Sequence, residues 1–171
     1  PPARRVSGPG AGWLMAPFTH VSPDRPSRFS DGSYGVLYVA KAIYTAIAET
    51  AYHHARFMAM TGEAPGWSSQ FREIWLDLEA ELHDLRGGEA AFAAALEPED
   101  YGEAQRLAAS LRAMGSEGMA YPSVRHAGGE CAGLFYPDRL ENPMQGRHLD
   151  YHWDGDRVDF IREAGMVAGK V

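Results

Sequence analysis

Two residues on one predicted helix have the types needed for acid–base or charge-stabilising chemistry. Glu49 and His53 are four residues apart, so in a helix they share one face. That face borders the apolar stripe that includes Ile43 and Ile47. The pair is either a solvated contact worth about 0.2–0.5 kcal/mol, or part of a site in which the carboxylate stabilises positive charge. The spacing alone leaves both interpretations open.

An arginine in a loop is a second candidate. Arg28 begins the segment Arg28-Phe29-Ser30-Asp31-Gly32, directly before a predicted strand. Its planar guanidinium can bind a phosphate through two parallel hydrogen bonds and does not lose its charge. Surface arginines in loops are common, so Arg28 alone does not establish a phosphate site. Tyr38, in the strand that follows, is by itself typical of a core position whose hydroxyl is satisfied nearby.

The remaining hydroxyl and thiol candidates are weaker. Ser123 follows Tyr121-Pro122 at the end of a short predicted strand, where the proline favours extended geometry and fixes the local direction of the chain. No Gly-x-Ser-x-Gly turn surrounds Ser123, so a hydrogen-bonding role is favoured over a nucleophilic one. Cys131 has no neighbouring cation to lower its pKa, which is typical of a small buried residue.

Acidic and imidazole side chains alternate near the end of the chain. His148, Asp150, His152 and Asp154 would project from one face of a strand, as a first shell for a divalent metal could. Same-face neighbours in a strand are about 6–7 Å apart, so only adjacent pairs could reach one ion and a further ligand would be needed. The other interpretation is the solvated face of an antiparallel hairpin.

Composition narrows the classes of function. The 171 residues are 45% hydrophobic and 23% charged, which is typical of one ordinary globular domain. A formal net charge of -7 disfavours nucleic acid as a direct partner. One cysteine excludes an internal disulfide and a thiolate metal cage. With neither a long apolar run nor a basic leader segment, we expect a cytoplasmic protein that does not enter a membrane.

The hydrophobic pattern predicts an α+β fold, a single domain with a mixed or antiparallel β core and flanking helices. Residues 1–33 are interpreted as loop, rich in Pro and Gly. Asp100 and Glu103 form a capping-box signature before a helix that ends at Gly115. Strands are predicted over 34–39, 71–85, 118–121, 132–136, and in a hairpin of 147–153 with 157–162; further helices are predicted over 40–60 and 90–96.

Taken in order, these segments resemble the RES domain, a family named for its Arg, Glu and Ser. The resemblance lies in Arg28-Phe29-Ser30-Asp31-Gly32, then Gly35 to Ala40, then Ala48-Glu49 with His53. The run from Gly115 to Ser123 resembles the family segment Gly-x-x-Gly-(apolar)-x-Tyr-x-Ser. The likeness extends from about Trp13 to Glu163. Residues 1–12 are therefore interpreted as an N-terminal extension, and 13–171 as a RES-like NAD-binding catalytic domain.

The resemblance implies a bacterial toxin that consumes NAD, pairs with an Xre-type antitoxin, and has a fold similar to ADP-ribosyltransferase toxins. It implies that Arg28 contacts the NAD phosphates, Tyr38 packs on the nicotinamide side, Glu49 is the catalytic carboxylate, and Ser123 completes the pocket. His53, one turn after Glu49, is a further candidate contact to NAD. The family often has Trp or Tyr with Asn after the first Arg, where this chain has Phe29-Ser30.

The chemistry of NAD fits those roles. Cleavage of the bond between ribose and nicotinamide passes through an oxocarbenium-like state, which a carboxylate stabilises without a metal. The acceptor of ADP-ribose is phosphate, water or the side chain of a target protein. The resemblance also leads us to expect a homodimer. Two alternatives from other classes remain: a metal-dependent hydrolase using His148, Asp150 and His152, and a non-catalytic NAD-binding interaction module.

Overall fold

The chain forms two compact units in a computed structural model that describes residues 2–88 and 90–164. The first unit contains the residues up to Ala46 together with Leu76–Pro143, and the second contains Ile47–Trp75 and the residues from Met144 onward. Helix α2 (Ile43–Thr61) and the strands β2 (Ser68–Leu78) and β6 (Leu140–Trp153) each belong partly to both units. Helices combined with mainly antiparallel sheets confirm the predicted α+β class.

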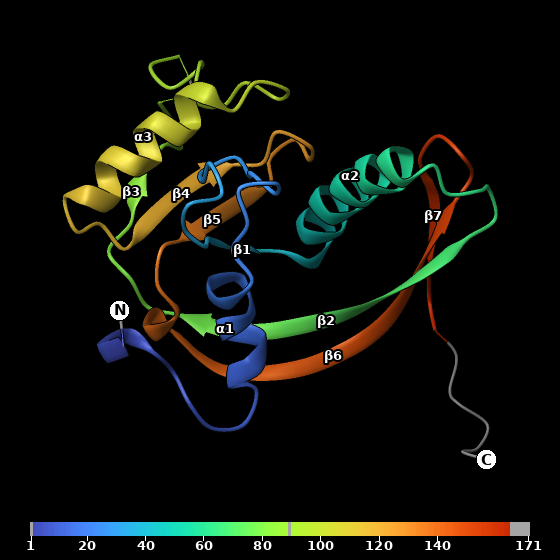
Figure 1. The fold of residues 1–171 in the computed structure, drawn as a ribbon, viewed down its shortest axis with the longest axis horizontal. Coiled ribbons are helices and arrows are strands. Elements are labelled where there is room, and N and C mark those ends of the chain that lie inside the picture. The colour runs from blue at the N-terminus through green and yellow to red at the C-terminus, as the bar shows by residue number, and fades with distance from the viewer. Residues whose placement is uncertain (1, 89, 165–171) are drawn as a thin grey trace. The chain divides into compact units, whose positions relative to one another are not determined.

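A four-stranded sheet is the centre of the first unit (Figure 1). Its strands lie in the order β1 (Leu37–Ala40), β5 (Glu130–Leu134), β4 (Gly118–Pro122) and β3 (His83–Asp84). The β1–β5 and β5–β4 pairs are antiparallel, whereas β3 and β4 are parallel. The strands predicted over 118–121 and 132–136 are confirmed as β4 and β5, and the bounds differ from the predicted ones by at most two residues.

Helix α3 (Gly102–Ala113) covers this sheet through small side chains. Ala104 and Ala108 are completely buried, which lets the helix backbone come close to the core around Phe29 and Met119. The predicted capping box is wrong: Tyr101 is the N-cap residue and makes no side-chain cap. Asp100 Oδ1 instead accepts a hydrogen bond from Gly102 N at 2.8 Å, and Glu103 pairs with Arg106 three residues on.

Two other local predictions are wrong, each because tertiary packing outweighs local preference. Residues 11–19, expected to be loop, form helix α1 (Ala11–Thr19) despite Gly12 and Pro17, because Leu14 packs into a cluster with Leu134 and Leu140. The alanine-rich segment 90–96 forms consecutive turns rather than a helix. A segment this short is marginal as a helix, because few hydrogen bonds offset the cost of the first turn.

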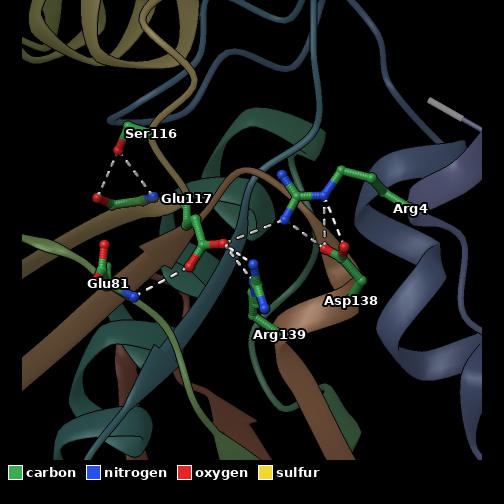
Figure 2. Close-up of polar contacts among 7 residues, drawn as sticks. Arg4, Glu81, Ser116, Glu117, Asp138 and Arg139 are labelled. Carbon is green, nitrogen blue, oxygen red and sulfur yellow. Dashed lines mark hydrogen bonds and ion pairs between the residues drawn. The ribbon is translucent and has the colours of Figure 1, made fainter.

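The N-terminal segment is attached to the first unit by Glu117, which directly precedes β4 (Figure 2). Its carboxylate pairs with Arg139, in the 3-10 helix Pro137–Arg139, and lies 3.6 Å from Arg4 Nη2. The same carboxylate accepts a hydrogen bond from Glu81 N at 3.1 Å. Arg4 also pairs with Asp138 at 2.8 Å. One carboxylate thus joins three segments that are distant in sequence.

The second unit is built on the predicted hairpin, which is confirmed: β6 pairs with β7 (Val158–Glu163) around the Asp154-Gly155 turn. Strand β2 lies on the other side of β6. The inward residues Leu149, Tyr151 and Trp153 are buried. Within the described residues, no helix combines the length and apolar content that a membrane span requires.

A buried carboxylate lies between β2 and β6. Glu73 is 8% exposed and accepts hydrogen bonds from Arg147 N, Nε and Nη2 at 2.9, 3.0 and 3.1 Å. These bonds lower the pKa of Glu73. Gly146 leaves room for this carboxylate, since a Cβ there would lie 2.4 Å from Glu73 Oε2 and would displace it. The single strand predicted over 71–85 is wrong in its extent, because β2 ends at Leu78 and β3 contains only His83 and Asp84. Along β2, the more covered side chains are at odd positions up to Glu73 and at Ile74 and Leu76 after it.

Helix α2 packs on this sheet through an aromatic cluster. Phe71 and Tyr151 stack with ring centroids 4.1 Å apart, and the His54 ring meets the Phe71 ring edge-on at 5.0 Å. His54 Nε2 is 2.8 Å from Ser69 Oγ. The Tyr151 hydroxyl is 2.8 Å from Thr50 Oγ1. Burial in this cluster lowers the pKa of His54.

The lowered pKa of His54 makes stability depend on pH. Between that pKa and the ordinary value of about 6.5, the unfolded chain binds a proton that the folded chain does not, so stability rises with pH across this window and levels off above it. We expect His54→Gln to weaken the dependence of melting temperature on pH between 5 and 7. His20→Gln, which changes an exposed histidine, is the matched control. Equal pH dependence in the wild type and His54→Gln would contradict the assignment.

Candidate functional site

Arg28 lies at the tip of a tight turn in the first unit. Ser27 and Ser30 exchange backbone hydrogen bonds of 2.8 and 3.3 Å, so Arg28 and Phe29 are the two central residues. Phe29 is completely buried and anchors the turn in the core. Its ring meets the Tyr121 ring edge-on at 4.9 Å and approaches β5 where Gly133 has no side chain. We call residues 27–30 the Arg28 turn.

The guanidinium of Arg28 is held in one orientation by the contacts described next, and only 7% of the residue is exposed. Its Nη1 donates to the carbonyl oxygens of Ala95 at 3.3 Å and Glu97 at 2.9 Å. Its Cζ lies 4.6 Å from the centroid of the Tyr101 ring. Within the described residues, Nε and Nη2 make no hydrogen bond with protein. These two nitrogens form the edge of the guanidinium that can bind two oxygens of one phosphate side by side.

Tyr38 holds the Arg28 turn from the sheet side. Its hydroxyl is 2.8 Å from Ser27 Oγ and accepts a hydrogen bond from Phe29 N at 2.9 Å. Its ring stacks on that of Phe29 with centroids 6.1 Å apart. Burial raises the pKa of Tyr38 to about 12, so the hydroxyl is protonated at neutral pH. The structure thus brings Arg28 and Tyr38 together, and the contact of Tyr38 with nicotinamide stays a prediction.

Ser123 organises the loop that follows β4. Its hydroxyl accepts hydrogen bonds from Arg125 N at 3.2 Å and His126 N at 3.0 Å, and its own N–H donates to Gly129 O at 2.8 Å. His126 Nδ1 in turn is 2.9 Å from Oγ1 of Thr45, a buried residue in the first turn of α2. The contact of Ser123 with NAD stays a prediction.

A second arginine, not singled out from the sequence, connects the Ser123 loop with the Arg28 turn. Arg125 Nη2 donates to Pro98 O at 2.6 Å and lies 3.1 Å from Glu99 Oε1. Arg28 binds carbonyl oxygens of the same segment, at Ala95 and Glu97. Segment 95–99 is therefore held by two guanidinium groups. No sequence motif indicates which carbonyls a buried arginine selects.

Glu49 and His53 belong to the second unit, on α2 as predicted. Glu49 is partly buried, and His53 is exposed with its ring edge-on to that of Tyr52 at 5.3 Å. Their spacing places them on one face of the helix, as expected. Their roles toward NAD stay predictions.

The outward face of β6 carries the residues considered as metal ligands. His148, Asp150 and His152 alternate with buried neighbours, so the prediction that they share a face is confirmed for these three. For Asp154 the prediction is wrong, because this residue follows β6 and its carboxylate accepts hydrogen bonds from Asp156 N and Arg157 N in the turn. Asp150 pairs with Arg162 of β7 at 3.3 Å, and His152 Nδ1 is 2.6 Å from Asp159 Oδ1. His148 Nε2 is 2.7 Å from the Gln145 amide nitrogen. Among residues 2–88 and 90–164, no three His, Cys, Asp or Glu side chains gather as metal ligands would.

The architecture and the anchored arginine define an α+β protein with a candidate site for an anionic ligand. The RES domain family matches residues 2–154, most of the chain, and the protein belongs to this family. Proteins of the RES domain family are in general enzymes that use NAD. The chain is also 28% identical over 162 residues to "Uncharacterized protein y4oC" of Sinorhizobium fredii (strain NBRC 101917 / NGR234). That match covers 87% of this chain and 60% of the relative's length.

The hydrogen bonds of Tyr38 predict a measurable contribution to stability. We expect Tyr38→Phe to lower the free energy of unfolding by about 1–3 kcal/mol, because Phe29 N loses its acceptor in a buried setting. Chemical denaturation monitored by circular dichroism measures this change. Tyr44→Phe, at a residue that is 72% exposed, is the matched control. If the two variants are equally stable, the hydroxyl does not hold the turn.

Proposed function

We propose that this protein binds NAD through Arg28 and cleaves the bond between ribose and nicotinamide. The observation that carries the proposal is the state of Arg28: Nη1 is fixed by two backbone carbonyls, while Nε and Nη2 have no protein hydrogen-bond partner among the described residues. A buried guanidinium with two such donors favours a bidentate anion, and the diphosphate of NAD is one. Membership of the RES domain family supports NAD as that ligand.

In the proposed reaction, the ribose C1′–N bond breaks and its electron pair passes to the nicotinamide ring nitrogen. This neutralises the pyridinium, so nicotinamide leaves without needing a proton. Positive charge develops on the ribose ring, and a carboxylate close to it stabilises the transition state. Glu49 is the residue proposed for this role. Tyr38 is proposed to pack on the nicotinamide side, with Ser123 and His53 as further contacts to NAD.

The nucleophile that then bonds to C1′ determines the product. Inorganic phosphate gives a phosphorylated ADP-ribose, water gives free ADP-ribose, and a protein side chain gives an ADP-ribosylated target. Water or a neutral protein side chain loses a proton to solvent or a nearby base as the new bond forms, whereas phosphate attacks through an ionised oxygen and needs to lose none. All three outcomes are consistent with a carboxylate that acts on the ribose and not on the acceptor.

We propose that the biological role is that of a growth-inhibiting toxin in the bacterial cytoplasm, neutralised by an Xre-type antitoxin. Loss of NAD or modification of a target protein would each stop growth. The family relationship supports this role and the partner. A homodimer is proposed on the same grounds, and nucleic acid is not proposed as a direct ligand because the chain is acidic.

Nicotinamide release tests the proposal directly. Purified wild type is incubated with NAD, with and without phosphate and a cell lysate, and the fate of ADP-ribose is followed by mass spectrometry. We expect Glu49→Gln to lower kcat by about 100–1,000-fold, because an electrostatic partner of the transition state is lost. Glu63→Gln, at an exposed carboxylate just after α2, is expected to match the wild type. Full turnover in folded Glu49→Gln would reject the assignment, and intact NAD with folded wild type would reject the proposed function.

A further inference from the structure

We propose that Gln105 is a positioning residue that holds Arg28 in its phosphate-binding orientation. The inference rests on the proposed function, because it concerns how the same site is built. Gln105 lies on α3 and is partly buried. It has no part in the sequence motifs that resemble the RES domain.

The side-chain amide of Gln105 closes the base of the Arg28 turn. Its Nε2 donates to Ser27 O at 2.9 Å and to Ser30 O at 3.3 Å. These are the two carbonyls that also accept the backbone hydrogen bonds across the turn. One amide group therefore fixes the separation of the two residues between which Arg28 and Phe29 are placed.

Apart from the two bonds of the Arg28 guanidinium, the other polar contacts of the turn come from residues close to it in sequence. Tyr38 binds Ser27 and Phe29 through its hydroxyl, and the Tyr34 hydroxyl donates to Phe29 O at 2.8 Å. Gln105 differs because it is contributed by a helix whose Ala104 and Ala108 are completely buried. The rigid helix is thereby connected to the turn that carries the arginine.

The same helix end also supports the guanidinium itself. Tyr101, the N-cap residue of α3, places its ring 4.6 Å from Arg28 Cζ. Gln105, one helical turn further on, holds the backbone from which that guanidinium extends. Arg28 is thus oriented at both ends of its side chain by α3, and a looser turn would let Nε and Nη2 move out of register with a phosphate.

The side chain at position 105 must be a hydrogen-bond donor, because both of its partners, Ser27 O and Ser30 O, are carbonyl oxygens. A glutamate of the same shape can donate only when its carboxyl is protonated, and when ionised it repels both carbonyls. Gln105→Glu therefore predicts a dependence on pH that the wild type lacks. Gln105→Met keeps the length of the side chain and removes the donor at every pH.

The test measures NAD affinity of the full chain by calorimetry, in a Glu49→Gln background so that NAD is not consumed. We expect Gln105→Met to weaken NAD binding by about three- to tenfold at all pH values. Gln105→Glu is expected to bind NAD more weakly at pH 8.5 than at pH 5.5, relative to the wild type at each pH. Gln70→Glu, which makes the same change at an exposed residue, is the control and is expected to follow the wild type. With Glu49 intact, the Gln105→Met change is expected in KM rather than kcat.

The outcomes separate this inference from the proposed function. If Arg28→Ala binds NAD as tightly as the wild type, the proposed function fails. If Arg28→Ala loses NAD binding but both folded Gln105 variants retain wild-type affinity and pH profile, the positioning role is overturned. A fall in melting temperature of Gln105→Glu with no pH-dependent change in affinity also overturns it, since that result describes a purely structural residue.

Discussion

The structure around the Arg28 turn depends on one interaction, the burial of the Arg28 guanidinium. A buried charge is costly unless hydrogen bonds and nearby polarisable groups replace water. Here two backbone carbonyls and the face of Tyr101 do so for one side of the group. The other side, Nε and Nη2, has no hydrogen-bond partner among the described residues, and we propose that it binds an anion.

The residues around the Arg28 turn hold its backbone in place, so that the guanidinium stays buried. The Phe29 side chain anchors the turn against a sheet made accessible by Gly133, so the arginine cannot swing away with a mobile loop. Hydroxyl groups of Tyr34 and Tyr38 satisfy the backbone on either side of Phe29. Segment 95–99 lacks regular secondary structure, which leaves its carbonyls available to Arg28 and Arg125 rather than to a helix. The failed prediction of a helix over 90–96 is in this sense informative about the site.

The sequence predicted the α+β class, the hairpin, and helices α2 and α3, and it singled out Arg28 as a candidate. These features depend on periodicity and turn residues, which are local. It did not predict α1, because that helix depends on where Leu14 packs, nor the role of Gln105, because its partners are backbone atoms 75 and 78 residues away. The sequence offered one indication of the role of Gln105, which is its position three residues before the buried Ala108 on a predicted amphipathic helix. Glu49, in contrast, was singled out by residue type and spacing, and its role toward NAD stays a prediction.

The central claim is that Arg28 recognises a diphosphate, and a thermodynamic cycle of two ligands and two proteins tests it most directly. Calorimetry would compare NAD with nicotinamide riboside, which lacks phosphate, on folded Glu49→Gln chains that either retain Arg28 or carry the additional substitution Arg28→Lys. We expect Arg28→Lys to weaken NAD binding by about tenfold or more, because the planar two-donor edge is lost, while binding of nicotinamide riboside changes little. Equal losses for both ligands, or no loss for NAD, would contradict it.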